Sequence, residues 1–516
     1  MDPVDPWLLH GFFERAAARD PDASALRCTG TTITYGELDR AGTAFARALL
    51  AQGLQPGDRV LLLLGNGVPL VVALLGTLRA GGVMVPVNPG VKAPKLRHLI
   101  ADCEPFALAY EASLESLVAA AIEGRASPWL LRSGRPLTGA AEFLAEDLEA
   151  LCAVDCGATP FPVQVIDRDL AALIYTSGST GEPKGVMLTH LNMVSALRSV
   201  SDYLGLRADD RIFCGLPLSF DYGLYQVLMS WRVGATVILE RSLALPAAVL
   251  ATLEREGATV LPGVPTFFAM LAALEGLAPG RAPRLRMVTS TAAALPEAHI
   301  AAVRRLFPGA RLFSMYGLTE CKRVTYLPPA DLDTRPGSVG RGMPNQEHWL
   351  VDAEGHRLPA GSTGELVVRG SHVMQGYWRK SVETAERLRI CPETGETVLY
   401  TGDMFRTDAD GYLYFVARRD DIIKSRGEKV SPREVENAIC TLEGVLEAAV
   451  VGVADPVLGQ AIKALVVPRP GVHVAAADVI RHCRARLELF MVPQLVEIVD
   501  MLPKTETGKT QRRALR

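Results

Sequence analysis

The alternation of short apolar runs with longer amphipathic runs constrains the fold of this chain more than any other feature of its sequence. Within the first 165 residues, this pattern predicts strands and helices at residues 32–35, 36–52, 59–64, 68–80 and 83–87. Strands that alternate with helices at such spacing predict a mainly parallel sheet covered by helices. After residue 170 the same pattern predicts elements at residues 190–203, 285–289 and 312–316. We therefore expect an α/β fold with parallel-type sheets.

The length of the chain, 516 residues, predicts more than one domain, because a single hydrophobic core rarely grows to that size. From about residue 335 glycine and proline become frequent and short strands alternate, which predicts a β-rich subdomain over about 335–419. We expect a large N-terminal domain of several subdomains, residues 1–419, and a small α+β C-terminal domain, residues 420–516. Because no low-complexity linker separates the two, Asp420 is expected to be a short hinge.

The charge balance and the apolar stretches exclude several classes of protein. The formal net charge is −3, whereas a nucleic-acid-binding surface needs a clustered excess of Lys and Arg, so no nucleic-acid partner is expected. Residues 68–87 are the most apolar stretch, but Arg79 and two adjacent glycines interrupt it, so no integral membrane segment is expected. The N-terminus lacks the basic region of a signal peptide. The nine cysteines are scattered, which is typical of reduced thiols, so a cytoplasmic protein is expected.

The segment from Tyr175 to Gly185, with the sequence YTSGSTGEPKG, is the strongest functional signal. Glycines let backbone N–H groups converge on an anion, hydroxyl groups add donors, and a lysine supplies compensating charge. The spacing differs from that of a Walker A loop, because the fifth residue after Gly178 is Pro183 and not glycine. This composition predicts a loop that binds phosphate groups.

This loop and the motifs that follow it resemble the adenylate-forming superfamily, which includes acyl- and aryl-CoA ligases, adenylation domains of peptide synthetases and beetle luciferases. The resemblance covers essentially the whole chain. It implies that the loop holds the β- and γ-phosphates of ATP. The implied ATP-binding residues of the loop are Thr176, Ser177, Gly178, Ser179, Thr180, Gly181 and Lys184.

The motif MYGLTE, residues 315–320, places a hydroxyl and a carboxylate side by side in a turn after a strand. Thr319 can donate a hydrogen bond to the α-phosphate, and Glu320 can bind Mg²⁺, a hard cation that accompanies polyphosphates. Tyr316 offers an aromatic face for adenine, and Gly317 belongs to the same nucleotide site. A capped turn without a ligand is the alternative for this motif taken alone, but its place after the phosphate loop favours a nucleotide site.

Further nucleotide contacts follow from the resemblance. Asp403, in the sequence YTGD, matches the aspartate that accepts hydrogen bonds from both ribose hydroxyls. Arg418 matches the companion of that aspartate near the ribose and phosphate. Ala293 and Ala294 fall where the family lines the adenine pocket, although the family usually has glycine in this segment.

Two lysines of the C-terminal domain match residues that serve two half-reactions in this superfamily. Lys509 lies in the tail sequence PKTETGK and matches the lysine that assists adenylate formation, whereas a solvated basic tail is the alternative. Lys424 lies in the segment 419–436, which in the family faces the site during transfer to the thiol. The resemblance implies that the small domain is mobile and alternates between these two states about Asp420.

The acyl pocket is expected from three places: Phe220 and Asp221, the segment that begins at Ser290, and the residues after Glu320. In amino-acid-activating members, an aspartate at the place of Asp221 pairs with the substrate ammonium group, whereas a turn without a ligand is the alternative. For the basic pair Lys322–Arg323, contact with an acidic acyl tail and contact with the phosphopantetheine of a carrier are alternatives, but the pair is expected to face solvent.

Together the motifs predict an AMP-forming carboxylate–thiol ligase that uses ATP and Mg²⁺. It is expected to convert a small carboxylic acid to its acyl-adenylate, release pyrophosphate and transfer the acyl group to a thiol. The sequence SRGEKVSP, residues 425–432, is closer to acyl- and aryl-CoA ligases than to peptide-synthetase domains, which favours coenzyme A as the acceptor. The alternative is a free-standing adenylation enzyme that loads an amino or β-amino acid onto the phosphopantetheine of an acyl or peptidyl carrier protein.

Overall fold

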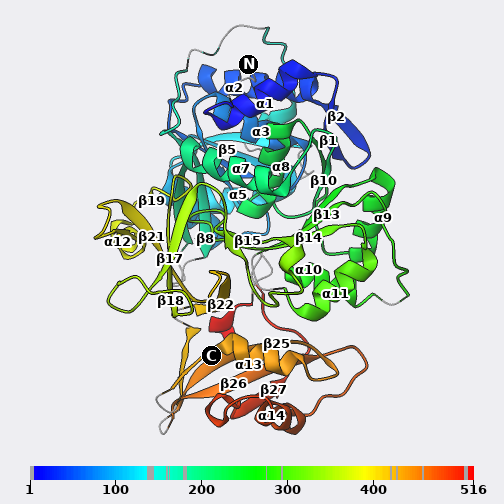
Figure 1. Cartoon of the computed structure of the whole chain (residues 1–516). Helices are drawn as coiled ribbons and strands as arrows, with labels where there is room; N and C mark the ends of the chain where they lie inside the picture. The colour runs from blue at the N-terminus through cyan, green and yellow to red at the C-terminus, as the bar shows by residue number, and fades with distance from the viewer. Residues whose placement is uncertain are drawn as a thin grey trace.

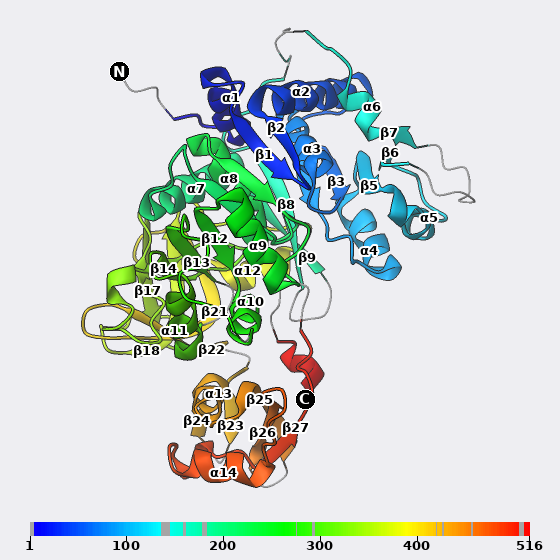
Figure 2. The same cartoon turned by 90° about the vertical axis from the view of Figure 1, so that its right-hand side faces the viewer.

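The computed structural model describes residues 5–135, 145–157, 161, 163–177, 183–274, 276–291, 295–418, 421–425, 428–455, 458–504 and 510–515. Within these residues the strands form four sheets, and Figures 1 and 2 show helices packed around the two larger sheets of the N-terminal part. The mixed α/β architecture expected from the alternating pattern is confirmed.

The first sheet has the strand order β19-β9-β8-β4-β3-β5-β6-β7. Its strands are β3 (Arg59–Leu63), β4 (Val83–Pro86), β5 (Ala107–Glu111), β6 (Trp129–Ser133), β7 (Glu146–Asp147), β8 (Leu170–Ser177), β9 (Pro183–Thr189) and β19 (Gly376–Tyr377). Strands β3 to β6 run parallel, whereas β8 and β9 form an antiparallel hairpin. The helices of this region are α2 (Tyr35–Ala51), α3 (Val68–Arg79), α4 (Ala93–Cys103), α5 (Glu115–Ile122) and α6 (Leu148–Cys152).

The second sheet has the order β16-β15-β14-β13-β12-β10-β11-β1-β2 and is parallel from β1 to β14. Its strands are β1 (Ser24–Cys28), β2 (Thr31–Thr34), β10 (Arg211–Cys214), β11 (Thr236–Leu239), β12 (Val260–Gly263), β13 (Met287–Ser290), β14 (Arg311–Tyr316), β15 (Thr325–Leu327) and β16 (Arg341–Gly342). Its helices are α1 (Leu9–Arg19), α7 (His190–Leu204), α8 (Asp221–Val233), α9 (Pro246–Glu256), α10 (Pro265–Ala272) and α11 (Glu297–Leu306).

One hydrophobic cluster joins these two sheets. It contains Phe12 of α1, Leu49 of α2, Leu74 of α3, Leu197 of α7 and Trp231 of α8, all at most 1% exposed. The shared cluster means that the helices between the sheets are buried on both sides, which explains why α3 is apolar around most of its circumference. Among the described residues, no helix combines the length and the apolarity that spanning a bilayer requires.

The third sheet is antiparallel and corresponds to the β-rich region expected from the glycine and proline content. Its strands are β17 (Gln346–Val351), β18 (Thr363–Gly370), β20 (Leu388–Ile390), β21 (Thr397–Thr407) and β22 (Leu413–Arg418), and α12 (Ser381–Arg387) lies beside it. The end of β22 leads directly into the last part of the chain, so the two parts are joined by only a few residues.

The C-terminal part is a separate α+β unit, drawn in orange and red at the foot of Figure 1. It contains β23 (Ile423–Ser425), β24 (Glu428–Val430), α13 (Pro432–Cys440), β25 (Val445–Asp455), β26 (Gly459–Pro468), α14 (Ala476–Arg484) and β27 (Leu495–Ile498). Its own hydrophobic clusters include Val435, Ile462 and Val479, each fully buried. The Ser431 hydroxyl accepts a hydrogen bond from the Glu434 N–H (3.4 Å), which caps α13 as its Ser-Pro start predicts.

Candidate active site

The glycine-rich segment lies at the end of the β8–β9 hairpin. Thr176 and Lys184 face each other across the two strands. Residues 178–182, which include Gly178, Ser179, Thr180 and Gly181, lie outside the described residues, as does the side chain of Ser177. The sequence predicted only a loop here, but residues 183–189 form a strand because Val186 and Leu188 are buried in the first sheet. The hairpin therefore fixes both ends of the predicted phosphate loop.

Tyr377 connects this hairpin to the Thr319–Glu320 turn. Its strand β19 pairs with β9, and the Lys184 Nζ atom lies 5.4 Å from the centre of the Tyr377 ring. The Tyr377 hydroxyl donates a hydrogen bond to Glu320 Oε1 (2.7 Å). Sequence reasoning missed Tyr377, because an isolated Gly-Tyr pair carries no spacing signal. Tyr377 therefore lies between Lys184 of the predicted phosphate loop and Glu320, the predicted metal ligand.

The turn that carries Thr319 and Glu320 is closely packed. A Cβ atom at Gly317 would lie 2.2 Å from the Lys322 carbonyl oxygen, so the turn requires glycine at that position. The backbone of Lys322 is left-handed (φ 61°), and the Met374 N–H donates to the Glu320 carbonyl (2.8 Å). These contacts hold the predicted catalytic turn against the segment between β18 and β19.

Asp403, the residue expected to bind the ribose, lies beside Tyr316 and Arg418. The Tyr316 hydroxyl donates to Asp403 Oδ2 (2.6 Å), and Arg418 Nε lies 3.6 Å from Asp403 Oδ1. Asp403 and Arg418 are direct cross-strand neighbours in β21 and β22. Burial and the Asp403 carboxylate raise the pKa of Tyr316 well above its ordinary value, so Tyr316 remains a donor. The ring of Phe405 packs edge-on against Tyr316, 4.8 Å between centres.

Glu320 is the residue of this turn that can supply a ligand to a Mg²⁺ ion. Mg²⁺ is usually bound by one or two carboxylates together with phosphate oxygens, and it keeps several water ligands. Glu320 supplies one carboxylate next to the strand that carries Lys184. Among the described residues, no group of three or more His, Cys, Asp and Glu side chains could hold a metal by itself. A single carboxylate suits a cation that arrives with polyphosphate.

The three segments expected to form the acyl pocket are brought together by buried polar contacts. Lys322 Nζ donates to the Asp221 carbonyl (2.9 Å) and lies 3.3 Å from Asp221 Oδ2, and Arg323 donates to the Thr291 hydroxyl. Ser290 is 1% exposed, and its hydroxyl has no hydrogen-bond partner among the described residues. Phe220 is half-buried immediately before α8.

The expectation that Lys322 and Arg323 face solvent is wrong. Lys322 is 5% exposed and Arg323 is 2% exposed. Their positive charges are buried because Asp221 and the Tyr222 and Tyr225 rings lie around them, with Lys322 Nζ 4.1 Å from the centre of Tyr225. Burial lowers the pKa of Lys322 to about 7, although Asp221 opposes this shift. The Asp221 carboxylate therefore already has a cationic partner within the chain.

Several predicted residues cannot be located. Ala293, Ala294, Asp420 and Lys509 lie outside the described residues, and for Lys424 only the backbone, in β23, is described. Lys504 and Thr510, at the two ends of the segment that contains Lys509, are bridge partners. Arg512, just beyond them, forms two hydrogen bonds with Glu436 of α13 (2.6 and 2.8 Å). The residues that follow the segment containing Lys509 are thus attached to the C-terminal unit.

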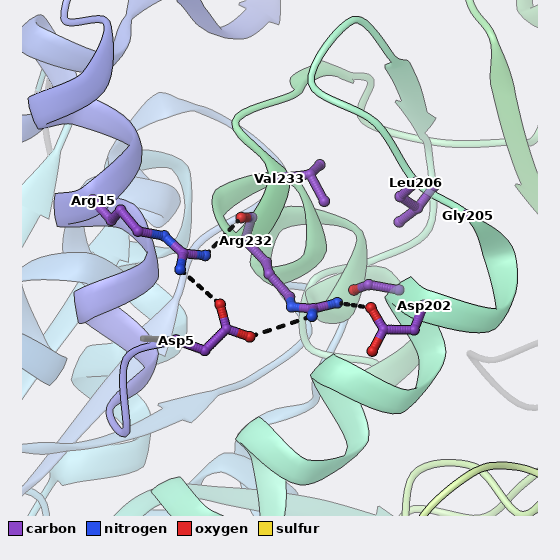
Figure 3. Close-up of a pocket in the computed structure, with 8 residues that line it drawn as sticks. Asp5, Arg15, Asp202, Gly205, Leu206, Arg232 and Val233 are labelled. Carbon is purple, nitrogen blue, oxygen red and sulfur yellow. Dashed lines mark hydrogen bonds and ion pairs between the residues drawn. The ribbon is translucent and has the colours of Figure 1, made fainter. Parts of the chain in front are cut away.

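A surface pocket of about 260 Å³ lies elsewhere, among the N-terminal segment, α7 and α8. Figure 3 shows Asp5 between Arg15 (2.6 Å) and Arg232 (3.3 Å), and Arg232 also pairs with Asp202 (2.5 Å). Burial would raise the pKa of Asp5, but the two arginines lower it. These ion pairs attach the N-terminal segment to α8, and no predicted site residue lines the pocket.

Comparison with known proteins shows the family of this chain. The family model "AMP-binding enzyme" matches residues 13–378, and the model of its C-terminal domain matches residues 434–509. This chain belongs to that family. It is 36% identical to a feruloyl-CoA synthase from Amycolatopsis, over 96% of both chains. It is 32% identical to an indoleacetate–CoA ligase from Aromatoleum aromaticum, over 98% of this chain and 96% of the relative. It is also similar to the crystal structure of ATP-bound MatB from Rhodopseudomonas palustris, with a TM-score of 0.89 and 31% identity over 98% of each chain.

Proposed function

We propose that this chain is an AMP-forming ligase that joins a small carboxylic acid to the thiol of coenzyme A. The observation that supports it most strongly is the convergence of Lys184, Tyr377 and Glu320 beside the Tyr316–Asp403 pair. Such a site offers a cation, a metal-binding carboxylate and a ribose acceptor within one group of strands. Similarity to CoA ligases along nearly their whole lengths supports the same conclusion.

In the first half-reaction, a carboxylate oxygen of the acid attacks the α-phosphorus of ATP and pyrophosphate leaves. Negative charge gathers on the phosphate oxygens, so preorganised cations and hydrogen-bond donors lower the barrier. We assign the β- and γ-phosphates to Lys184 and the hydroxyls of residues 176–180. Thr319 would donate to the α-phosphate, and Lys509 would add a positive charge there. Mg²⁺, bound by Glu320 and the phosphates, would neutralise part of the charge.

In the second half-reaction, the thiol attacks the acyl carbonyl, and AMP leaves with the oxygen that came from the acid. We assign this step to a second orientation of the C-terminal domain, in which the β23–β24 hairpin with Lys424 replaces Lys509 at the site. Asp420 would be the hinge. The short connection after β22 supports a rotation of this kind.

We favour coenzyme A as the acceptor because the relatives matched along nearly their whole lengths are named CoA ligases. The carrier-protein alternative remains testable by supplying phosphopantetheine on a carrier instead of CoA. The predicted location of the reaction, the cytoplasm, stays a prediction.

Product analysis tests the proposal. The purified chain is incubated with ATP, Mg²⁺, CoA and either ferulate or indoleacetate, and nucleotides and thioesters are separated by chromatography. We expect AMP and acyl-CoA in equal amounts, and no product from a Lys184→Ala variant. Formation of ADP in place of AMP, or the absence of any acid-dependent ATP–pyrophosphate exchange over a wide panel of acids, would refute it.

A further inference from the structure

The buried lysine after the catalytic turn lies in an unusual position for a positive charge. Lys322 Nζ is within hydrogen-bonding distance of both the carbonyl and the carboxylate of Asp221, at 2.9 and 3.3 Å. The rings of Tyr222 and Tyr225 cover it from one side, and only 5% of the residue is exposed. An isolated buried charge is costly, so these partners are what keep it there.

The backbone conformation of the turn directs the Lys322 side chain into the interior of the protein. Lys322 adopts a left-handed conformation (φ 61°), and its carbonyl packs on Gly317. The N–H of the following residue, Arg323, donates a hydrogen bond to the Cys321 carbonyl (2.7 Å). The Arg323 side chain donates a second hydrogen bond to the Thr291 hydroxyl. The turn thus directs one basic side chain to the start of α8 and the next to the end of β13.

The charges of this cluster do not balance. Asp221 contributes one negative charge, whereas Lys322 and Arg323 each carry a basic group, and Arg323 Nε has no hydrogen-bond partner among the described residues. A substrate ammonium group that entered the cluster would compete with Lys322 for a single carboxylate and would meet the Arg323 guanidinium as a like charge. An acid without an ammonium group meets no such penalty.

We propose that the Lys322 side chain occupies the place beside Asp221 and thereby makes the enzyme select acids that lack an amino group. This specificity-determining role rests on the proposed ligase function and narrows its substrate class to amine-free carboxylic acids. Lys322 fills the place by its volume as well as by its charge, so the selection holds whether or not the side chain is protonated. The substitution Lys322→Ala would leave Asp221 without its partner and would open a space of the size of a small alkylammonium ion.

Matched acid pairs that differ only in the amino group provide the first test. ATP–pyrophosphate exchange is measured for two pairs of acids, 3-phenylpropanoate with phenylalanine and indole-3-propanoate with tryptophan. The pair whose amine-free member reacts faster is used for the comparison. For the wild type we expect kcat/KM to favour the amine-free acid by at least roughly 100-fold. A wild-type preference for the amino acid overturns the inference without any variant. A wild type that exchanges with no acid at all instead refutes the ligase function.

Substitution of Lys322 provides the second test. Lys322→Ala is expected to reduce that preference by about tenfold or more, because Asp221 becomes available to an ammonium group. Lys322→Arg, which keeps a cation, should retain the wild-type preference, and so should the double variant Lys322→Met/Asp221→Asn, which has no carboxylate to offer. An unchanged preference in Lys322→Ala, or an equal reduction in the double variant, contradicts the proposal.

A binding measurement that needs no turnover completes the test. Ethylammonium chloride should raise the thermal midpoint of Lys322→Ala in a saturable way, because the ion replaces the deleted side chain. Sodium chloride at the same concentration should not do so, and neither the wild type nor the double variant should respond to ethylammonium. If Lys322→Ala is recovered folded only when ethylammonium is present during purification, that result supports the proposal as well. Equal responses of all three proteins would overturn it.

Discussion

The burial of Lys322 predicts a specific dependence of stability on pH. Burial lowers the pKa of its ammonium group from the ordinary 10.5 to about 7, against the opposing effect of Asp221. Below pH 7 the lysine is protonated in the folded and unfolded chains alike, and the folded protein bears the full cost of the buried charge. Between the two pKa values the unfolded chain binds more protons, so the free energy of unfolding rises with pH.

The size of this effect follows from the same two pKa values. Integration of the difference in bound protons from pH 7 to pH 9 gives a rise of about 2 kcal/mol from this one group. The reference is the double variant Lys322→Met/Asp221→Asn, because removing the lysine alone would leave a buried carboxylate unpaired at a cost of about 3–5 kcal/mol. Neutral replacements of similar volume are expected to leave the fold intact.

Urea unfolding at pH 7, 8 and 9, followed by tryptophan fluorescence, measures the effect. The free energy of unfolding of the wild type minus that of the double variant should increase by about 2 kcal/mol over this range. Curves that run parallel, or a difference that falls as the pH rises, would show that burial does not lower the pKa of Lys322.

The remaining predictions concern the nucleotide site. Tyr377→Phe removes the hydrogen bond to Glu320 and is expected to lower kcat/KM for Mg·ATP by roughly 10- to 100-fold, measured by pyrophosphate exchange at several Mg²⁺ concentrations. Tyr316→Phe should raise the KM for ATP by a similar roughly 10- to 100-fold. Tyr412→Phe is its control, since it removes an equivalent tyrosine–aspartate bond to Asp331 (2.7 Å) outside the site and should leave the KM unchanged. Lys509→Ala should reduce acid-dependent pyrophosphate exchange by at least roughly 100-fold while transfer from preformed acyl-adenylate to CoA continues; equal loss of both steps would refute the division of roles.

Much of the fold could be predicted from the sequence because its pattern is regular. Residues 59–64, 68–80 and 83–87 were expected as strand, helix and strand, and the structure has β3, α3 and β4 there within one residue at each end. The hairpin strand 183–189 was missed, because its glycine and proline indicate a loop and its pairing with β8 and β19 depends on distant residues.

The nucleotide site could be predicted for a different reason. Phosphate binding and metal binding demand particular residue types at short spacing, so Lys184, Glu320 and their neighbours are visible in local motifs. Tyr377 could not be found this way, because its importance comes from a contact with a residue 57 positions away. The burial of Lys322 and Arg323 could not be predicted from the sequence either, because basic residues in a turn are normally exposed. Asp221 and the tyrosine rings come close to these residues only in the tertiary structure.

Transfer of oxygen from the acid to the nucleotide tests the central claim, that an acyl-adenylate forms at this site. The acid that reacts best is labelled with ¹⁸O in its carboxylate and incubated with the enzyme, ATP, Mg²⁺ and CoA, and the products are analysed by mass spectrometry. Attack of the carboxylate on the α-phosphorus predicts one ¹⁸O atom in each AMP formed and none in pyrophosphate. Label in orthophosphate or pyrophosphate, or AMP without label, would contradict an acyl-adenylate intermediate.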